Sequence, residues 1–131
     1  DTDHFKSYND GYGHLAGDQC LREVAAALAE SIGTTDATLA RYGGEEFAVV
    51  LAGSTIADAM MLAERLRIAV EARALPHAHS APGRVTLSIG VAMRDATADT
   101  APATLIGRAD SALYAAKRGG RNRVVAAEHL P

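Results

Sequence analysis

The stretch from Val85 to Met93 constrains the fold most, because apolar residues alternate there with small ones. Alternate residues of a β-strand face opposite sides of a sheet, so this period of two predicts a strand with one apolar face. A strand of that kind must be covered by other elements to keep its apolar face from water. We therefore expect a sheet with helices packed on it.

Three segments, 15–32, 56–70 and 105–116, repeat apolar residues at spacings of three and four. This is the period of an amphipathic helix. Gly33 ends the first helix and Gly119-Gly120 the last, while Ser54-Thr55 offers an N-cap to the second. The glycine-rich stretch 9–17 predicts a flexible bend before the first long helix.

Two short apolar runs, 39–42 and 47–51, flank Gly43-Gly44-Glu45-Glu46, a pattern typical of a hairpin. Residues 123–127 predict a last strand. The order of elements predicts an α/β fold, or α+β sandwich, with helices on the faces of a largely antiparallel sheet. With 131 residues, 48% of them hydrophobic, the chain can form one domain with its own core.

The charge and apolar pattern exclude several classes of function. A net charge of -3 argues against binding a nucleic acid backbone. No apolar run approaches the roughly 18 residues of a membrane span, so we expect no membrane contact. The single Cys20 fits a reducing compartment, and we expect a cytoplasmic location. Cys20 lies on an apolar helix stripe and is expected to be an inert core residue.

Acidic residues gather at two places, Asp1 and Asp3 at a predicted strand end and Glu45 and Glu46 at the hairpin tip. If the hairpin lies beside the first strand, Asp1 and Glu45 meet as hard oxygen ligands. Such ligands suit Mg²⁺ that is shared with nucleotide phosphates. The alternative is that these carboxylates are solvated, since acidic turns are common.

Lys6 follows Asp3 at the start of a helical turn, where free N–H groups can accept a phosphate. Asn9 and Asp18 have the donors and acceptors to read a guanine edge, although helix capping would also explain them. Lys117 and Arg121 bracket the last helix terminus and could reach a triphosphate. Compensation of the helix dipole is their alternative explanation.

His77 and His79 could pair on a metal ion, but they lie in a segment bounded by prolines, and no third ligand is near in the sequence. We interpret this segment as a solvated loop.

The ordered set of motifs resembles the diguanylate cyclase (GGDEF) family, in its Gly-Gly-Glu-Glu-Phe form. The resemblance covers nearly the whole chain, through the segments 1–10, 13–18, 41–47, 87–92, 109–117 and 119–124. Each motif alone is modest, and the ordered set is highly specific. The resemblance implies a sheet like that of nucleotidyl cyclase and polymerase palm domains. It also implies that 1–131 is one such domain, lacking its leading helix and most of its first strand.

The resemblance implies three groups of site residues. The ligands of Mg²⁺, or of Mn²⁺ in its place, would be Asp1, the Thr2 carbonyl, Glu45 and Glu46. The guanine pocket would contain Phe5, Asn9, His14 and Asp18. The phosphates would be bound by Lys6, Arg41, Lys117 and Arg121. Glu45 would accept the proton in catalysis, with Glu46 and Lys6 assisting.

The implied activity is condensation of two GTP into cyclic di-GMP across a homodimer, in a bacterial signalling protein with an attached sensor or receiver domain. One alternative is a catalytically silent module that binds GTP or cyclic di-GMP. Another is a cyclase that uses ATP, which Asp18 disfavours. The Arg-x-x-Asp product-inhibition site of many relatives is replaced by Thr34, Thr35, Asp36 and Ala37. We therefore expect that inhibitory site to be absent.

Overall fold

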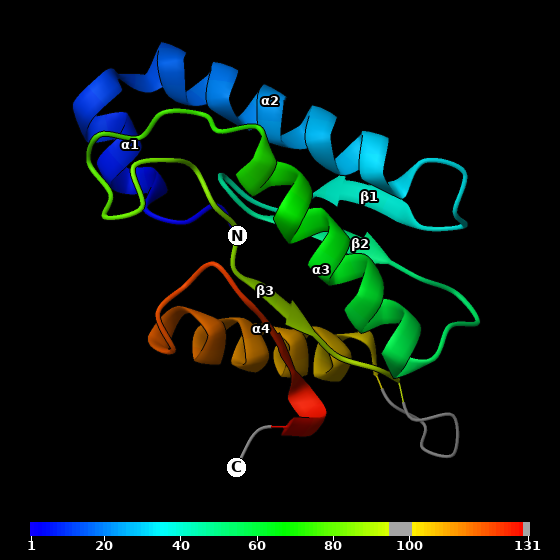
Figure 1. The fold of residues 1–131 in the computed structure, drawn as a ribbon. Coiled ribbons are helices and arrows are strands. Elements are labelled where there is room, and N and C mark those ends of the chain that lie inside the picture. Colours follow the sequence, from blue (N-terminus) through cyan, green and yellow to red (C-terminus); the bar gives the residue numbers. More distant parts are fainter. Residues whose placement is uncertain (95–100, 130–131) are drawn as a thin grey trace.

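The computed structural model describes residues 1–94 and 101–129. Helices α1 (Phe5–Tyr12), α2 (His14–Ile32) and α3 (Ile56–Ala72) lie on one side of the strands, and α4 (Pro102–Arg118) lies on the other (Figure 1). A short 3₁₀ helix, η1 (Ala127–His129), follows the last strand. The predicted α/β architecture is confirmed.

The strands form two pairs. Strands β1 (Thr38–Arg41) and β2 (Phe47–Val50) are antiparallel, with Thr38 opposite Val50. Strands β3 (Ile89–Val91) and β4 (Val124–Ala126) are parallel, with Ile89 opposite Val124. The hairpin therefore forms where it was predicted. The second pair is parallel and makes a separate two-stranded sheet, where a single, largely antiparallel sheet was expected.

The opening segment, Asp1–Asp3, joins the two pairs by backbone hydrogen bonds on both sides. The Thr2 N–H donates to the Glu45 carbonyl at 3.1 Å, at the tip of the β1–β2 hairpin. On the other side Asp3 N donates to Thr86 O at 2.9 Å, and Ser88 N donates to Asp1 O at 3.1 Å. The chain start thus lies between the hairpin and the segment that leads into β3.

The strand predicted at 85–93 is shorter than expected, since regular pairing is confined to Ile89–Val91. Residues 85–88 are nevertheless fully buried and alternate as predicted. Val85 and Leu87 belong to the main core, whereas Thr86 and Ser88 bond to the Asp3 carboxylate. The small residues of the alternation therefore serve a polar contact inside the protein.

Helices α2 and α3 supply most of the core, and they end close to the predicted positions. Thr55 begins α3 with a capping box, in which its hydroxyl and the Asp58 carboxylate bond to each other's backbone N–H. The core cluster comprises Phe5, Cys20, Leu21, Val24, Ala27, Leu28, Ile32, Leu62, Leu66, Val70, Val85 and Leu87. None of the helices in the described part of the chain is long and apolar enough to cross a membrane.

The prediction of a flexible bend at 9–17 was wrong. Helix α1 continues to Tyr12, and the break is confined to Gly13, whose φ of 88° favours glycine. The helix persists because Phe5 is buried in the core and Tyr8 packs against it. Gly17 lies within α2, where it allows α1 to approach closely.

Gly90 is expected to be the least replaceable glycine of the sheet. A Cβ there would overlap the backbone of α4, at the Ala109 carbonyl and the Leu113 nitrogen. Gly90→Ala should therefore lower the free energy of unfolding by about 1–3 kcal/mol, as overpacked cores do. Gly107→Ala is the matched control, because nothing lies within 4 Å of its Cβ position. Urea unfolding measures both, and equal effects would contradict this packing.

Cys20 is expected to be unreactive in the folded protein. The residue is 4% exposed, and burial raises the pKa of its thiol to about 11, against the opposing effect of a hydrogen bond with Tyr8. The reactive thiolate is then on the order of one part in ten thousand at pH 7. A thiol reagent should label the native protein slowly at pH 7, faster at higher pH, and fully in urea. Rapid labelling of the native protein at pH 7 would contradict this.

Candidate functional site

The opening segment and the hairpin tip lie side by side at one place in the molecule, named here the acidic corner and made up of Asp1, Thr2, Glu45 and Glu46. The hairpin tip lies directly against the opening segment, because both the N–H and the hydroxyl of Thr2 donate to the Glu45 carbonyl, at 3.1 and 3.3 Å. The backbone of Glu45 is therefore held next to that of Thr2, one residue from Asp1.

A cation from the far end of the chain completes this corner. Lys117 Nζ lies 3.3 Å from the Asp1 carboxylate, whose side chain is only 6% exposed. Lys117 is in the last turn of α4, so the packing of α4 on β3 determines where its ammonium group lies. An anion bound here would meet a lysine that is already in place.

The Asp1 carboxylate and the Thr2 carbonyl have the character of metal ligands. Thr2 is 2% exposed, and no backbone N–H of the described residues donates to its carbonyl. Carboxylates and backbone carbonyls are the ligands that Mg²⁺ prefers. Within 1–94 and 101–129, however, no three His, Cys, Asp or Glu side chains are grouped closely enough to hold a metal ion alone.

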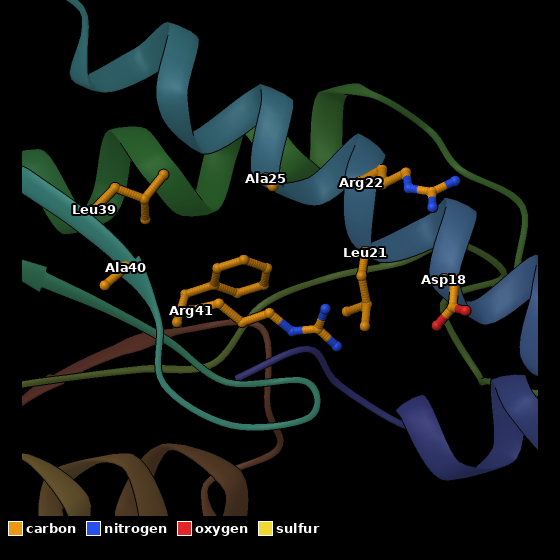
Figure 2. Close-up of a pocket in the computed structure, with 8 residues that line it drawn as sticks. Asp18, Leu21, Arg22, Ala25, Leu39, Ala40 and Arg41 are labelled. Atoms are coloured by element: carbon orange, nitrogen blue, oxygen red, sulfur yellow. The ribbon is translucent and has the colours of Figure 1, made fainter.

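Arg41 holds the shape of the hairpin tip. Its guanidinium donates to the Gly43 carbonyl at 3.2 Å and to the Gly44 carbonyl at 2.6 and 3.1 Å. Arg41 also lines an open groove of about 420 Å³ between α2 and the hairpin, which Asp18 borders at the other end (Figure 2). The position of Arg41 thus supports a role in ordering Glu45 and Glu46.

A second polar site lies where α1 meets α2. The Oδ1 atom of Asn9 is buried and finds no hydrogen-bond donor among the described residues. A Cβ on Gly17 would overlap that atom and would lie 3.2 Å from the Phe5 ring. His14 and Asp18, one turn apart at the start of α2, are exposed. The helix contact thus brings Phe5 and Asn9 next to Gly17, the residue before Asp18.

The remaining predicted cations, Lys6 and Arg121, lie at the start of α1 and in the turn after α4. Lys6 is exposed in the first turn of α1, a helix that begins without a side-chain cap. Its first N–H groups are therefore available to another acceptor. Arg121 lies in the turn after α4, four residues beyond Lys117, and is half-buried.

The interpretation of His77 as part of a solvated loop was wrong. The side chain is 1% exposed, and its Nε2 lies 3.0 Å from the His4 carbonyl, next to the edge-on ring of Tyr8. The aromatic residues of α1 bury it, which the sequence around His77 could not indicate. His77 stabilises the left-handed turn at His4 (φ 54°) that starts α1.

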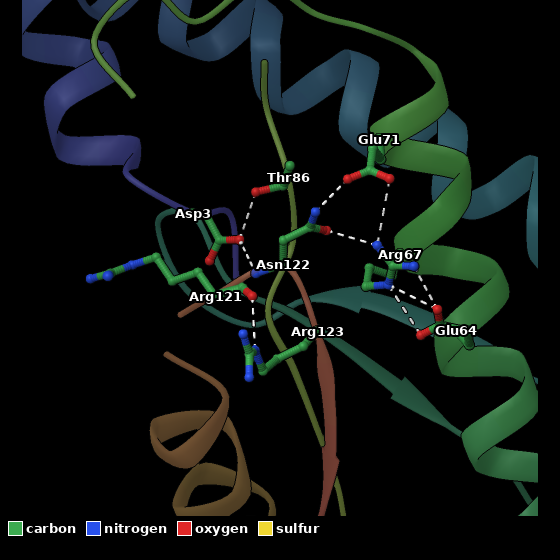
Figure 3. A network of polar contacts seen from close by, with 8 residues as sticks. All are labelled: Asp3, Glu64, Arg67, Glu71, Thr86, Arg121, Asn122 and Arg123. Carbon is green, nitrogen blue, oxygen red and sulfur yellow. Dashed lines mark hydrogen bonds and ion pairs between the residues drawn. The ribbon is translucent and has the colours of Figure 1, made fainter. Parts of the chain in front are cut away.

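Sequence reasoning also missed the polar network around Asp3 and Asn122, shown in Figure 3. Asp3 was noted only as one of an acidic pair. It is 3% exposed and accepts hydrogen bonds from Thr86, Ser88 and the Asn122 N–H. The alternation that places Asp1 and Asp3 on one strand face was a usable signal, whereas nothing local distinguished Asn122.

Comparison with known proteins places this geometry in one family. The family model described as "Diguanylate cyclase, GGDEF domain" matches residues 1–123. The chain is 45% identical over 129 residues to the response regulator PleD of Caulobacter vibrioides, covering 95% of this chain and 27% of PleD. It is 44% identical over 124 residues to diguanylate cyclase A of Treponema denticola, covering 95% of this chain and 33% of that protein.

Solved structures of domains with this family name are also similar to this chain. The GGDEF domain of DgcB from Caulobacter crescentus, in complex with c-di-GMP, superposes with a TM-score of 0.86 at 41% identity, covering 98% of this chain and 74% of that one. The active GGEEF domain of a diguanylate cyclase from Vibrio cholerae gives a TM-score of 0.78 at 35% identity, covering 96% and 78%. The chain thus spans most of these solved domains but only 27% and 33% of the two curated relatives.

Proposed function

Because this chain belongs to the GGDEF family of diguanylate cyclases, we propose that it condenses two GTP molecules into cyclic di-GMP and releases pyrophosphate from each. The observation that carries the proposal is the meeting of the hairpin tip and the opening segment through the Thr2–Glu45 hydrogen bonds. Lys117, in contact with Asp1, adds a phosphate-binding charge to the same corner. This juxtaposition of carboxylates and a cation suits a metal-bound triphosphate.

The proposed metal ligands are Asp1, the Thr2 carbonyl, Glu45 and Glu46, and the cation is Mg²⁺ or Mn²⁺. The buried Thr2 carbonyl, with its unused acceptor capacity, supports this set. Such an ion would take further oxygen ligands from the nucleotide phosphates. When bound, the ion would neutralise the α-phosphate and lower the pKa of the attacking hydroxyl.

Guanine is proposed to bind beside the α1–α2 contact. The unpartnered Oδ1 of Asn9 can accept a hydrogen bond from the base, which would satisfy a buried polar atom. Asp18 would accept from the paired N1–H and N2–H donors that guanine has and adenine lacks. Phe5 and His14 would line the same pocket, with Phe5 fixing the position of Asn9 across Gly17.

The triphosphate is proposed to extend from this pocket to the acidic corner. Lys6 and the uncapped start of α1 would bind it from one side. Lys117 and Arg121 would bind it from the other, and each would contact oxygens whose charge grows as pyrophosphate leaves. Arg41 would act through the hairpin, since its guanidinium is bonded to the tip carbonyls.

In the proposed reaction the 3′-hydroxyl oxygen of one GTP attacks the α-phosphorus of another. Glu45 accepts the hydroxyl proton while the bond to pyrophosphate breaks, and Glu46 and Lys6 assist at the same centre. One domain binds one GTP, so two domains must face each other to bring each hydroxyl in line. The active species is therefore proposed to be a homodimer.

Attached sensor or receiver domains would control that pairing in a longer signalling protein. PleD, named a response regulator, supports this arrangement, since the matched part is only 27% of its length. Because its substrate GTP is a cytoplasmic nucleotide, we place the domain in the cytoplasm.

The decisive assay incubates the intact protein with GTP and Mg²⁺ and measures cyclic di-GMP and pyrophosphate at several protein concentrations. Rates per domain should rise with concentration as dimers form. Glu45→Gln should lower the rate by at least about a hundredfold, since a positioned proton acceptor contributes that much. Glu128→Gln, on η1, is the matched control and should retain activity. GTP binding without turnover in the unaltered protein would instead favour a silent sensor.

Asp18→Ala tests base recognition. The variant should bind 3′-deoxy-GTP about tenfold more weakly, because two hydrogen bonds to a carboxylate are lost. Binding of 3′-deoxy-ATP should change little, since adenine does not offer those donors. Gln19→Ala is the control, because Gln19 is the exposed neighbour on the same helix. Equal losses for both nucleotides, measured by calorimetry, would contradict the assignment of Asp18 to guanine.

A further inference from the structure

The turn after α4 has an unusual backbone. Arg121 and Asn122 are consecutive residues with positive φ angles, 65° and 45°. The Arg121 N–H donates to the Ala116 carbonyl at 3.0 Å, which closes the end of the helix. Left-handed conformations are unfavourable for L residues, and asparagine tolerates them best after glycine. An arginine in this conformation must be held there by its neighbours.

Asn122 provides that restraint through its backbone N–H and both polar atoms of its side chain (Figure 3). Its backbone N–H donates to Asp3 Oδ2 at 3.0 Å. Its side-chain Oδ1 accepts from Arg67 Nη1 at 2.9 Å, and its Nδ2 donates to the Glu71 carboxylate. The turn is thus bonded to the opening segment on one side and to α3 on the other.

The partners of Asn122 are themselves fixed. Asp3 is 3% exposed and also accepts from the hydroxyls of Thr86, at 2.8 Å, and Ser88, at 2.6 Å. Arg67 is ion-paired with Glu64 at 2.5 Å on its own helix. The Asp3 end of this network is buried and bonded on several sides, so it has little freedom to rearrange. It therefore defines one position for the turn.

The Arg121 side chain takes no part in this network. Its side chain extends from the turn away from α3, opposite to the direction of the Asn122 side chain (Figure 3). Its backbone is used locally, since the N–H donates to Ala116 and the carbonyl accepts a hydrogen bond from Arg123 Nε at 3.1 Å. Within the described part of the chain its guanidinium makes no ion pair, so it can bind an anion.

We propose that Asn122 is a positioning residue, which holds the left-handed turn so that Arg121 is aimed at the nucleotide phosphates. This inference rests on the proposed function, in which Arg121 binds those phosphates. Asp3 connects the turn to the acidic corner, because it lies two residues after Asp1 on the same segment. One short segment thereby sets the place of both the metal ligand and the phosphate cation.

Asn122→Ala in the intact protein tests the proposal. The variant loses the contacts to α3 and favours a right-handed backbone, so Arg121 should no longer be held in place. Affinity for 3′-deoxy-GTP with Mg²⁺ should fall about tenfold, the cost of one misplaced charged hydrogen bond. Affinity for guanosine, which has no phosphates, should change by less than about twofold. Equal losses for both ligands would overturn the proposal, because they would indicate a general structural defect.

A double-mutant cycle with Arg121→Gln separates this inference from the proposed function. If Asn122 acts through Arg121, Asn122→Ala should cost little more once Arg121 is replaced. If the losses of affinity of the two single variants instead multiply in the double variant, the two residues act independently. That result would overturn the inference alone and leave the phosphate role of Arg121 intact. An unchanged affinity of Arg121→Gln for 3′-deoxy-GTP would overturn both.

Asn122→Gly provides the test if the alanine variant does not fold. Glycine keeps the left-handed turn accessible and retains the N–H bond to Asp3, so only the side-chain contacts to α3 are lost. Its affinity for 3′-deoxy-GTP should fall by a smaller factor, about threefold, and affinity equal to the unaltered protein would overturn the proposal. Arg108→Gln is the matched control, because it removes the ion pair between Arg108 and Glu128 elsewhere on α4.

Discussion

The two-sided hydrogen bonding of the opening segment is the constraint on which the rest of the site depends. Thr2 bonds to the hairpin tip at Glu45, and Asp3 bonds to the segment before β3. A short stretch of backbone therefore sets the spacing between the hairpin and the second strand pair. The candidate metal ligands, which come from distant parts of the sequence, are close together because this stretch links both sides. Secondary structure alone would not bring them together.

Sequence patterns predicted much of the fold because helices and turns depend largely on residues close to one another in the sequence. The period of three and four placed α2 within one residue of its start, and the turn residues between two apolar runs located the hairpin. The bend at 9–17 was predicted wrongly, because the burial of Phe5 and Tyr8 outweighs the low helix propensity of the residues around them. Propensity is a weak guide where tertiary packing decides.

Site residues could be predicted where the nearby sequence indicates their chemistry. Residues whose role depends on contacts with distant parts of the sequence could not be predicted. Carboxylates at a strand end and at a turn suggested a cation, but Asn122 bonds to Asp3 across 119 positions of sequence. His77 is buried by aromatic residues of α1, 73 positions from the carbonyl that it contacts. Contacts of such range follow from the final packing, and no pattern near either residue encodes them.

The close approach of β3 to α4 has a mechanical consequence. At Gly90 the strand backbone touches the helix backbone with no side chain between them. The helix can pack directly on the strand only because residue 90 carries a hydrogen atom in place of a side chain. A larger group at that position would push α4 outward, and Lys117 in the last turn of that helix would move with it.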